Sequence, residues 1–279
     1  MIEKNSVKTI AVSGGKGGVG KTCIAVNIAT EIASHGFSVL LMDADLGMAN
    51  VDLLLNLKPR VDLYHVVSGE CELEEILVEG PAGVSIVPAA SGIGCMANLS
   101  NFQQIGLIKA FADLSQRFDY LLVDTATGIA PQVINFTKAA QEIVVVVCDE
   151  PASITDAYGL IKVLNVEHGV KRFQILANMV ADGDQGQELF TRLVTVAAKF
   201  LNVSLGYLGS IPMDSRLREA VQLRQAVTQR FPVCASSIAF QQIARRVMNL
   251  PGSNRTSGQV EFFMEQVANI SLVQAGAIS

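Results

Sequence analysis

The chain has 279 residues, of which 50% are hydrophobic and 17% are charged, and its mean hydropathy is +0.38. This composition predicts a large core of the kind formed by a sheet buried under helices on both faces, and the length suits one α/β domain. The net charge of −5 argues against a protein that lies on the phosphate backbone of DNA, so we do not expect direct DNA binding.

The sequence shows no feature that would direct the chain out of the cytoplasm. Residues 1–6 lead into the first predicted strand without the apolar segment of a signal peptide. No apolar run approaches the roughly 18 residues of a membrane-spanning helix. The five cysteines show no C-x-x-C spacing, which is typical of reduced thiols. We therefore expect a cytoplasmic protein that at most contacts a membrane peripherally.

A glycine-rich loop lies between a predicted strand at 9–12 and a predicted helix that runs from Lys21 to about Ser34. Residues 15–22 match G-x-x-x-x-G-K-[ST] in the strand-to-helix context that this phosphate-binding pattern requires, which argues against a ligand-free glycine turn. Glycines let successive backbone N–H groups face phosphate oxygens, and the helix start adds its positive dipole end. Lys21 would reach the outer phosphates, and the Thr22 hydroxyl would ligate Mg²⁺. The predicted nucleotide-binding residues here are Gly15, Lys16, Gly17, Gly18, Val19, Gly20, Lys21, Thr22 and Cys23.

Acidic residues follow two other predicted strands. Asp43 and Asp45 come after the strand at 38–42, and Asp124 comes after the strand at 120–123. In a doubly wound sheet the carboxyl ends of parallel strands meet at one edge, beside the phosphate loop. Asp124 has the position of a Walker B carboxylate, which holds the water shell of Mg²⁺. An aspartate at a strand end is by itself most often a turn or cap residue, so this prediction depends on the loop upstream.

The stretch that follows the second strand alternates loops with short amphipathic segments. Residues 46–52 predict a mobile loop that closes into a short helix and is a candidate switch. We expect small insertion helices within 58–79, with His65 in a structural role, and a third strand at 83–88. Apolar residues at helical spacing predict a helix over 107–114.

An apolar run at 143–148 has no polar position, which predicts a strand in the centre of the sheet. It opens onto Glu150 and Pro151, and a proline suits the first position of the helix that follows. The next strand is predicted at 173–177, with Asn178 at its tip. An amide there offers an acceptor and donors to a purine edge, although an asparagine that caps a turn is an equally ordinary interpretation.

The remainder of the domain predicts an edge strand and three helices. The edge strand begins near Leu205 and leads into a loop, and helices are expected at 215–224 and 238–250. The loop consists of Pro212, Met213 and Asp214. Before this edge strand, four apolar residues recur at helical spacing, which predicts a helix whose apolar face packs in the core. These are Leu189, Leu193, Val196 and Phe200.

We divide the chain into a P-loop domain at 1–250, a linker at 251–259 and a C-terminal amphipathic helix and tail at 260–279. Proline, glycine and serine mark the linker. A helix that lies on a membrane normally carries Lys or Arg on its polar face. The tail helix carries Glu261 and Glu265 instead, so docking onto the domain or a partner is at least as consistent with the sequence as lipid contact.

Three segments together resemble the deviant Walker A ATPases of the MinD/ParA class: 16–22 (KGGVGKT), 43–50 (DADLGMAN) and 124–128 (DTATG). The resemblance covers most of the first 250 residues and implies a doubly wound, mostly parallel α/β sheet flanked by helices. Within the class, three further segments look most like the FlhG/FleN regulators of flagellar number. These are 87–92 (VPAASG), 148–158 (CDEPASITDAY) and 177–179 (ANM).

The resemblance implies ATP and Mg²⁺ as cofactors and an ATP-bound homodimer as the active species. Lys16 would reach into the partner's site and neutralise transition-state charge, as an arginine finger does, while Lys21 serves its own subunit. Asp45 would position the attacking water. Asp43 and Asp124 would support the Mg²⁺ shell, with Thr22 as the direct ligand.

The same resemblance implies how the rest of the nucleotide is held. Asn178 and the loop from Pro212 to Asp214 would hold adenine, and Glu150 would contact nucleotide across the dimer. ATP binding would drive dimerisation and hydrolysis would reverse it, which makes a population switch. The expected partners in the FlhG/FleN group are a flagellar master transcription regulator, the flagellar GTPase FlhF and the inner face of the membrane.

Two departures from the family pattern qualify these expectations. Members that stimulate the GTPase carry a DQAxxLR-like segment near the N-terminus, and residues 1–8 contain none. We therefore expect antagonism of the regulator rather than stimulation of FlhF. Thr127 stands where the family usually has Ala, and we expect its hydroxyl to find water or backbone partners.

Three alternatives compete with this interpretation. A ParA-type partition or cargo-positioning ATPase shares the switch but binds DNA nonspecifically, which the acidic balance opposes. A nitrogenase-type reductase would bridge its subunits with an iron–sulfur cluster, yet no cysteine occurs between Asp124 and Cys148. A nucleotide-bound interaction module with negligible hydrolysis would share the loop and differ in its lack of turnover.

Overall fold

The computed structural model describes residues 7–45, 50–88, 109–111, 113–114 and 117–251. The described residues form an eight-stranded sheet in the order β3-β4-β2-β5-β1-β6-β7-β8, in which each neighbouring pair is parallel except β3 and β4. The predicted doubly wound, mostly parallel sheet is confirmed. The strands are β1 (Lys8–Ser13), β2 (Val39–Ala44), β3 (Val78–Glu79), β4 (Ser85–Val87), β5 (Tyr120–Thr125), β6 (Glu142–Val147), β7 (Arg172–Val180) and β8 (Ser204–Pro212).

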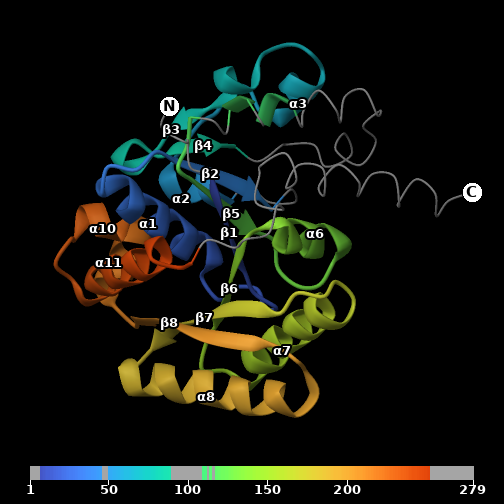
Figure 1. Ribbon diagram of the computed structural model, residues 1–279. Coiled ribbons are helices and arrows are strands. Elements are labelled where there is room, and N and C mark those ends of the chain that lie inside the picture. Colours follow the sequence, from blue (N-terminus) through green and yellow to red (C-terminus); the bar gives the residue numbers. More distant parts are fainter. Residues whose placement is uncertain (1–6, 46–49, 89–108, 112, 115–116, 252–279) are drawn as a thin grey trace, which may run out of the picture.

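Helices cover both faces of the sheet (Figure 1). On one face α1 packs against α11, with α10 beside them, and on the other face lie α6, α7 and α8. The helices are α1 (Lys21–Ser34), α2 (Asn50–Leu55), α3 (Leu63–Val67), α6 (Pro131–Ala139), α7 (Pro151–Val166), α8 (Gly183–Phe200), α9 (Ser215–Gln222), α10 (Val227–Arg230) and α11 (Ala235–Met248). Two short 3-10 helices are η1 (Leu73–Ile76) and η2 (Pro81–Gly83).

Strand β6 shows why the sheet is buried on both sides. Its side chains alternate between two apolar clusters: Val144 and Val146 join the cluster under α1 and α11, whereas Val145 joins the cluster under α7 and α8. A strand with both faces covered needs no polar position. The central place of β6, between β1 and β7, confirms the prediction made from its uninterrupted apolar run.

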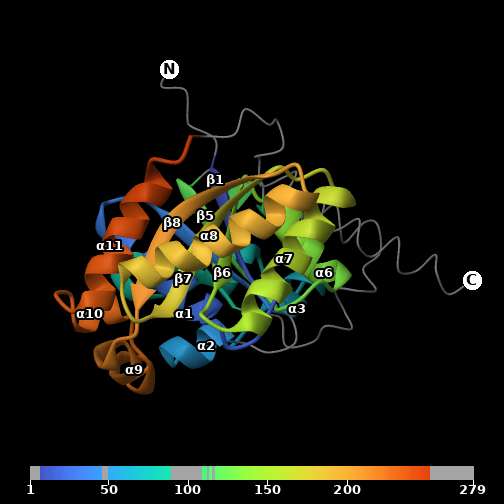
Figure 2. The same ribbon diagram turned by 90° about the horizontal axis from the view of Figure 1, so that it is seen from below.

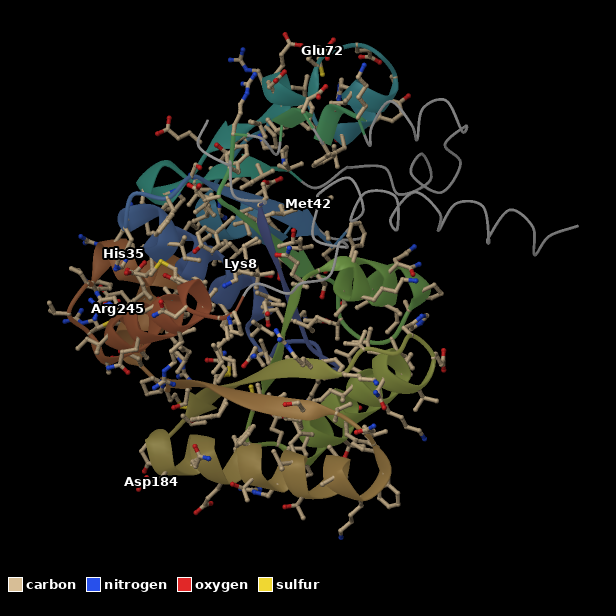
Figure 3. The ribbon with its side chains drawn as sticks, viewed as in Figure 1. Lys8, His35, Met42, Glu72, Asp184 and Arg245 are labelled. Atoms are coloured by element: carbon tan, nitrogen blue, oxygen red, sulfur yellow. The ribbon has the colours of Figure 1, made fainter. Side chains whose placement is uncertain are left out.

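The carboxyl ends of β1, β2 and β5 lie together at one edge of the sheet, where the functional residues gather. Asp43 and Asp124 are direct register partners across β2 and β5, and Val12 is the partner of Asp124 across β1 and β5. At the opposite edge Lys8 Nζ donates to the carbonyl oxygens of Val247 and Leu250 at the end of α11 (Figure 3). These two hydrogen bonds hold the C-terminal end of α11 beside the start of β1.

Several predictions need correction. The expected core stripe of α8 is wrong for Val196, which is 38% exposed, and for Phe200, which is 73% exposed, because the buried face runs through Leu189, Leu193 and Ala197. Phe200 is the last residue of α8, so no further helical turn shelters it. Strand β7 continues to Val180, three residues beyond the predicted end, so Asn178 lies inside the strand rather than at its tip.

Other differences concern element bounds. Helix α11 begins at Ala235, three residues earlier than predicted, and α6, α10 and the short strand β3 were not predicted. His65 completes the N-terminal cap of α3, the structural role expected of it. The first part of the candidate switch (46–49), part of the helix predicted at 107–114, the linker from 252 and the tail lie outside the described residues. Among the described helices, none has the length and apolar character needed to cross a membrane.

Candidate nucleotide-binding site

The loop between β1 and α1 is held from two sides. A Cβ atom on Gly15 would lie 2.2 Å from the carbonyl oxygen of Asp156 on α7. A Cβ atom on Gly20 would lie 2.5 Å from Nδ2 of Asn178, and the φ of Gly20 is +90°, a conformation that other residues adopt at a cost. Asn178 Nδ2 donates to the carbonyl oxygen of Val19 at 2.8 Å. Close packing and backbone conformation therefore both require glycine here.

A cavity of about 530 Å³ opens at this loop, a volume in the range of small-ligand sites. Gly17 and Gly18 face open space, since a Cβ atom on either would meet no atom within 4 Å. The other walls come from the start of α1, the ends of β2 and β5, and helices α2 and α9, which lie near each other in Figure 2. The lining residues beyond the loop glycines are Lys21, Thr22, Cys23, Asp45, Asn50, Leu53, Leu54, Thr125, Thr127, Val221 and Arg224.

Lys21 lies inside this cavity. Lys21 is only 8% exposed, and its Nζ donates to the Thr127 hydroxyl at 2.7 Å. Burial lowers the pKa of Lys21, while the carboxylates of Asp124 and Asp45 act in the opposite direction. The Thr127 hydroxyl therefore has a side-chain partner, not the water or backbone partner that we expected from the sequence.

Asp124 is the best candidate for holding a cation. It is 1% exposed, and neither carboxylate oxygen has hydrogen-bond geometry with another described residue. Burial raises the pKa of Asp124 to about 7, against the opposing effects of the nearby Thr22 hydroxyl and Lys21. A carboxylate this deeply buried, with at most the Thr22 hydroxyl as a donor, calls for a cation, and oxygen ligands next to a phosphate loop suit Mg²⁺ with its water shell. The residues present thus fit the metal that the sequence predicted.

Asp43 has a different environment. It is fully buried, and its carboxylate accepts backbone N–H groups from Asp45 at 3.0 Å, Asn50 at 2.9 Å and Val51 at 3.0 Å. Burial raises the pKa of Asp43 to about 6, and these three donors oppose that rise. Oδ2 fastens the start of α2 to the end of β2, and Oδ1 holds the backbone of Asp45 directly after β2. This geometry favours a structural role over the predicted metal role, which stays a prediction.

Asp45 faces the cavity and is oriented by the helix that follows. Asn50 Nδ2 donates to Asp45 Oδ2 at 2.9 Å, and both residues line the cavity. The backbone N–H of Asp45 is held by Asp43. The position of the Asp45 carboxylate therefore depends on the start of α2, the described end of the candidate switch.

Lys16 lies outside the cavity that contains Lys21. Its side chain is 35% exposed and forms an ion pair with Glu150, which is 58% exposed and comes directly before α7. The hydrogen bond with Glu150 raises the pKa of Lys16. The neighbouring Asp149 is fastened to α8 by Gln185 Nε2 at 2.7 Å and Arg192 at 3.4 Å. The two lysines of the loop thus occupy separate environments.

The residues predicted to hold adenine are not part of the cavity wall. Asn178 is buried and supports the loop through Val19, as described above. Asp214 caps α9 through Arg216 N–H at 2.8 Å and also accepts the backbone N–H of Ser236 at 2.9 Å. Met213 is exposed, and Pro212 ends β8. The structure brings these residues to the same end of the sheet without assigning them a ligand.

Sequence reasoning missed the walls that α2 and the C-terminal end of α9 contribute. Leu53, Leu54, Val221 and Arg224 line the cavity next to Thr22 and Cys23. Arg224 Nη1 donates to Asn56 Oδ1 at 2.8 Å, which joins the C-terminal ends of α9 and α2. No sequence motif marks these residues, because they are brought together only by the packing of helices distant in the chain.

Comparison with known proteins agrees with this geometry. The family model described as an AAA domain matches residues 7–175. The antiactivator FleN of Pseudomonas aeruginosa is 51% identical, with 94% of this chain and 93% of FleN covered. The flagellum site-determining protein YlxH of Helicobacter pylori is 34% identical over 86% of this chain and 82% of YlxH. In the solved MinC:MinD cell division complex of Aquifex aeolicus, the similar chain is 27% identical, with a TM-score of 0.67 and coverage of 88% and 97%.

Motif, fold and relatives therefore point to the same group. The phosphate loop carries both lysines, the sheet is doubly wound, and the identity to FleN extends over nearly the full length of both chains. This chain belongs to the FlhG/FleN-like members of the MinD/ParA class of P-loop ATPases.

Proposed function

We propose that this protein is an ATP-dependent dimerisation switch that hydrolyses ATP slowly and limits the number or placement of flagella. The kinship with an antiactivator and with a flagellum site-determining protein supports a flagellar role. Its direct partner in this proposal is a flagellar master transcription regulator, which the ATP-bound dimer would hold inactive. FlhF is a further proposed partner.

The position of Lys16 is the observation that carries the proposal. A lysine needed by its own phosphate site would be expected to face the cavity, as Lys21 does. Lys16 instead projects outside it, in an exposed ion pair with Glu150. An exposed ion pair is weak. A phosphate group of the ATP bound in a second subunit would therefore compete effectively with Glu150 for Lys16. Each subunit would then complete the catalytic site of the other.

The remaining roles follow from the environments of the side chains. Lys21 and the loop N–H groups would bind the phosphates, and Thr22 with Asp124 would hold Mg²⁺. Bound Mg²⁺ supplies neutralisation of charge on the outer phosphates. Asp45, oriented by Asn50, would place the attacking water. Because Asn50 begins α2, a shift of that helix would couple the state of the nucleotide to the dimer surface.

The C-terminal part has a separate place in the proposal. Residues 1–250 would act as the ATPase domain, 251–259 as a linker, and 260–279 as an amphipathic helix that docks on the domain, on a partner or peripherally on the inner face of the membrane. We expect the chain to work in the cytoplasm. Deletion after Gly258 tests the membrane contact, since it should abolish ATP-dependent sedimentation with liposomes of anionic lipid.

The central test is light scattering of the full-length protein with ADP and with a nonhydrolysable ATP analogue. We expect monomers with ADP and dimers with the analogue, and binding of the purified flagellar master regulator only to the dimer. Lys16→Ala should still bind ATP and lose hydrolysis, whereas Lys21→Ala should lose binding. Equal masses in both nucleotide states, or unchanged hydrolysis by Lys16→Ala, would contradict the proposed switch.

A further inference from the structure

Thr127 occupies a fixed position at the phosphate end of the cavity. It lies in the loop that connects β5 to α6, three residues after Asp124. Its flanks are fastened to β1 and to the first residue of the phosphate loop: the Thr125 hydroxyl donates to the carbonyl oxygen of Val12 at 3.1 Å, and the Gly128 N–H donates to that of Gly14 at 3.2 Å. The Thr127 side chain is therefore presented to the cavity by a backbone with little freedom to move.

The Thr127 hydroxyl accepts one hydrogen bond and still has its own hydrogen to donate. Lys21 Nζ donates to Thr127 Oγ1 at 2.7 Å, which occupies a lone pair of the oxygen. A hydroxyl also carries one hydrogen to donate, and within the described residues that hydrogen has no acceptor. Because Thr127 lines the cavity together with Lys21 and Asp45, this hydrogen can be directed towards a ligand there.

Position along the cavity determines which part of a ligand the hydroxyl would meet. Thr22 and Cys23 begin the helix that leads away from the loop, whereas Asp45 and Thr127 come from the ends of β2 and β5. The lysine of a phosphate loop contacts the outer phosphates, and Thr127 is bonded to that lysine. The hydroxyl thus lies at the outer-phosphate end of the site.

We infer that Thr127 is a positioning residue for Lys21 and donates a hydrogen bond to the outermost phosphate of ATP, so that it raises the preference of the site for ATP over ADP. This inference rests on the proposed function, since it assumes ATP in this cavity. A hydroxyl between an ammonium group and a phosphate oxygen accepts from the first through a lone pair and donates its one hydrogen to the second. An alanine or valine at this position would leave the buried Lys21 without this partner.

The test compares nucleotide affinities of the full-length protein and three variants by isothermal titration calorimetry, with ADP and with a nonhydrolysable ATP analogue. Thr127→Val keeps the shape and removes the hydroxyl, Thr127→Ala removes the side chain, and Thr127→Ser restores a hydroxyl. We expect Val and Ala to weaken binding of the analogue about tenfold, or about 1.4 kcal/mol. We expect ADP binding to weaken by less than about threefold, and Ser to lie within about threefold of the wild type for both ligands.

The outcomes separate this inference from the proposed function. If the wild type bound the analogue but Thr127→Val bound it equally well, or lost the analogue and ADP in equal measure, the inference would be wrong and the switch would stand. If the wild type bound neither nucleotide, the proposed function itself would fail. Should Thr127→Val not fold, Thr127→Ala and Thr127→Ser give the same comparison, since alanine removes the hydroxyl without adding bulk.

Discussion

Mixing two inactive variants tests whether Lys16 acts in its own subunit or in its partner. Lys16→Ala keeps the whole described cavity, including Asp45, and lacks only the lysine that lies outside it. Asp45→Ala keeps Lys16 and loses the carboxylate that Asn50 orients. In a mixed dimer, the site of the Lys16→Ala subunit would receive Lys16 from its partner. That one site would contain every catalytic group, although neither variant alone can form it.

The expected magnitudes follow from the positions of the two residues. Lys16 and Glu150 form an exposed pair, so its loss should leave the unfolding transition nearly unchanged. Each variant alone should lose hydrolysis by at least about 10³-fold, the lower range for removal of an arginine finger. In an equal mixture, half of the dimers are mixed and each has one complete site, so activity should return to about a quarter of the wild-type level.

The assay is steady-state phosphate release at a total protein concentration well above that needed for dimerisation. Lys162→Ala, which removes an exposed lysine on α7, is the matched control and should hydrolyse ATP like the wild type. An equal mixture no more active than either variant alone would refute the trans role, provided that light scattering shows dimers. In that case Lys16 would have to act within its own subunit.

Three further predictions concern the loop, its support and the opposite edge of the sheet. Gly20→Ala should lower the melting temperature, because its Cβ would lie 2.5 Å from Asn178 Nδ2 at a φ of +90°; Gly17→Ala, which faces open space, is the control and should melt like the wild type. Asn178→Ala should weaken ATP and GTP binding equally in calorimetry, because it removes a bond to the Val19 carbonyl; selective loss of ATP would instead support a direct contact with adenine. Arg172→Ala should reduce the free energy of unfolding by about 1–3 kcal/mol, since Glu142 is buried and Arg172 half-exposed, and leave ATP affinity unchanged. Burial raises the pKa of Glu142, so the loss of unfolding free energy in Arg172→Ala should be smaller at about pH 4.5, where the carboxyl group takes up a proton, than at about pH 8. Urea unfolding at both pH values measures this difference. An equal loss at the two pH values would mean that the ion pair contributes nothing to stability.

The parts of the site that the sequence predicted are those where one short segment sets the geometry. The phosphate loop is such a case, because glycine spacing, the preceding strand and the following helix all lie within 8–34. Asp124 is another, since an aspartate in the last residues of an apolar strand lies at the sheet edge where the loop lies. Local chemistry and the topology of a parallel sheet were sufficient for both.

The parts that the sequence did not predict depend on contacts between distant segments. The bond between Lys21 and Thr127 joins residues 106 positions apart, and the Asn56–Arg224 bond joins residues 168 positions apart. Asp43 is a different case, because an aspartate next to a phosphate loop suits metal binding by its chemistry. Only the path of the chain into α2 brings three backbone N–H groups onto its carboxylate.

The environments of the two loop lysines fit the proposal that one motif serves two subunits. Lys21 is buried, bonded to Thr127 and close to the carboxylates of Asp124 and Asp45. Moving Lys21 away would break its hydrogen bond with Thr127 and leave the two carboxylates without this nearby positive charge, which is unfavourable. Lys16 has one exposed partner, and the exchange of that partner for a phosphate loses little in water. A lysine that is easily released on the outside and a lysine that is firmly held on the inside are what a site completed by a second subunit requires. The free energy of the proposed switch would therefore reside in the dimer contacts, with little needed to free Lys16.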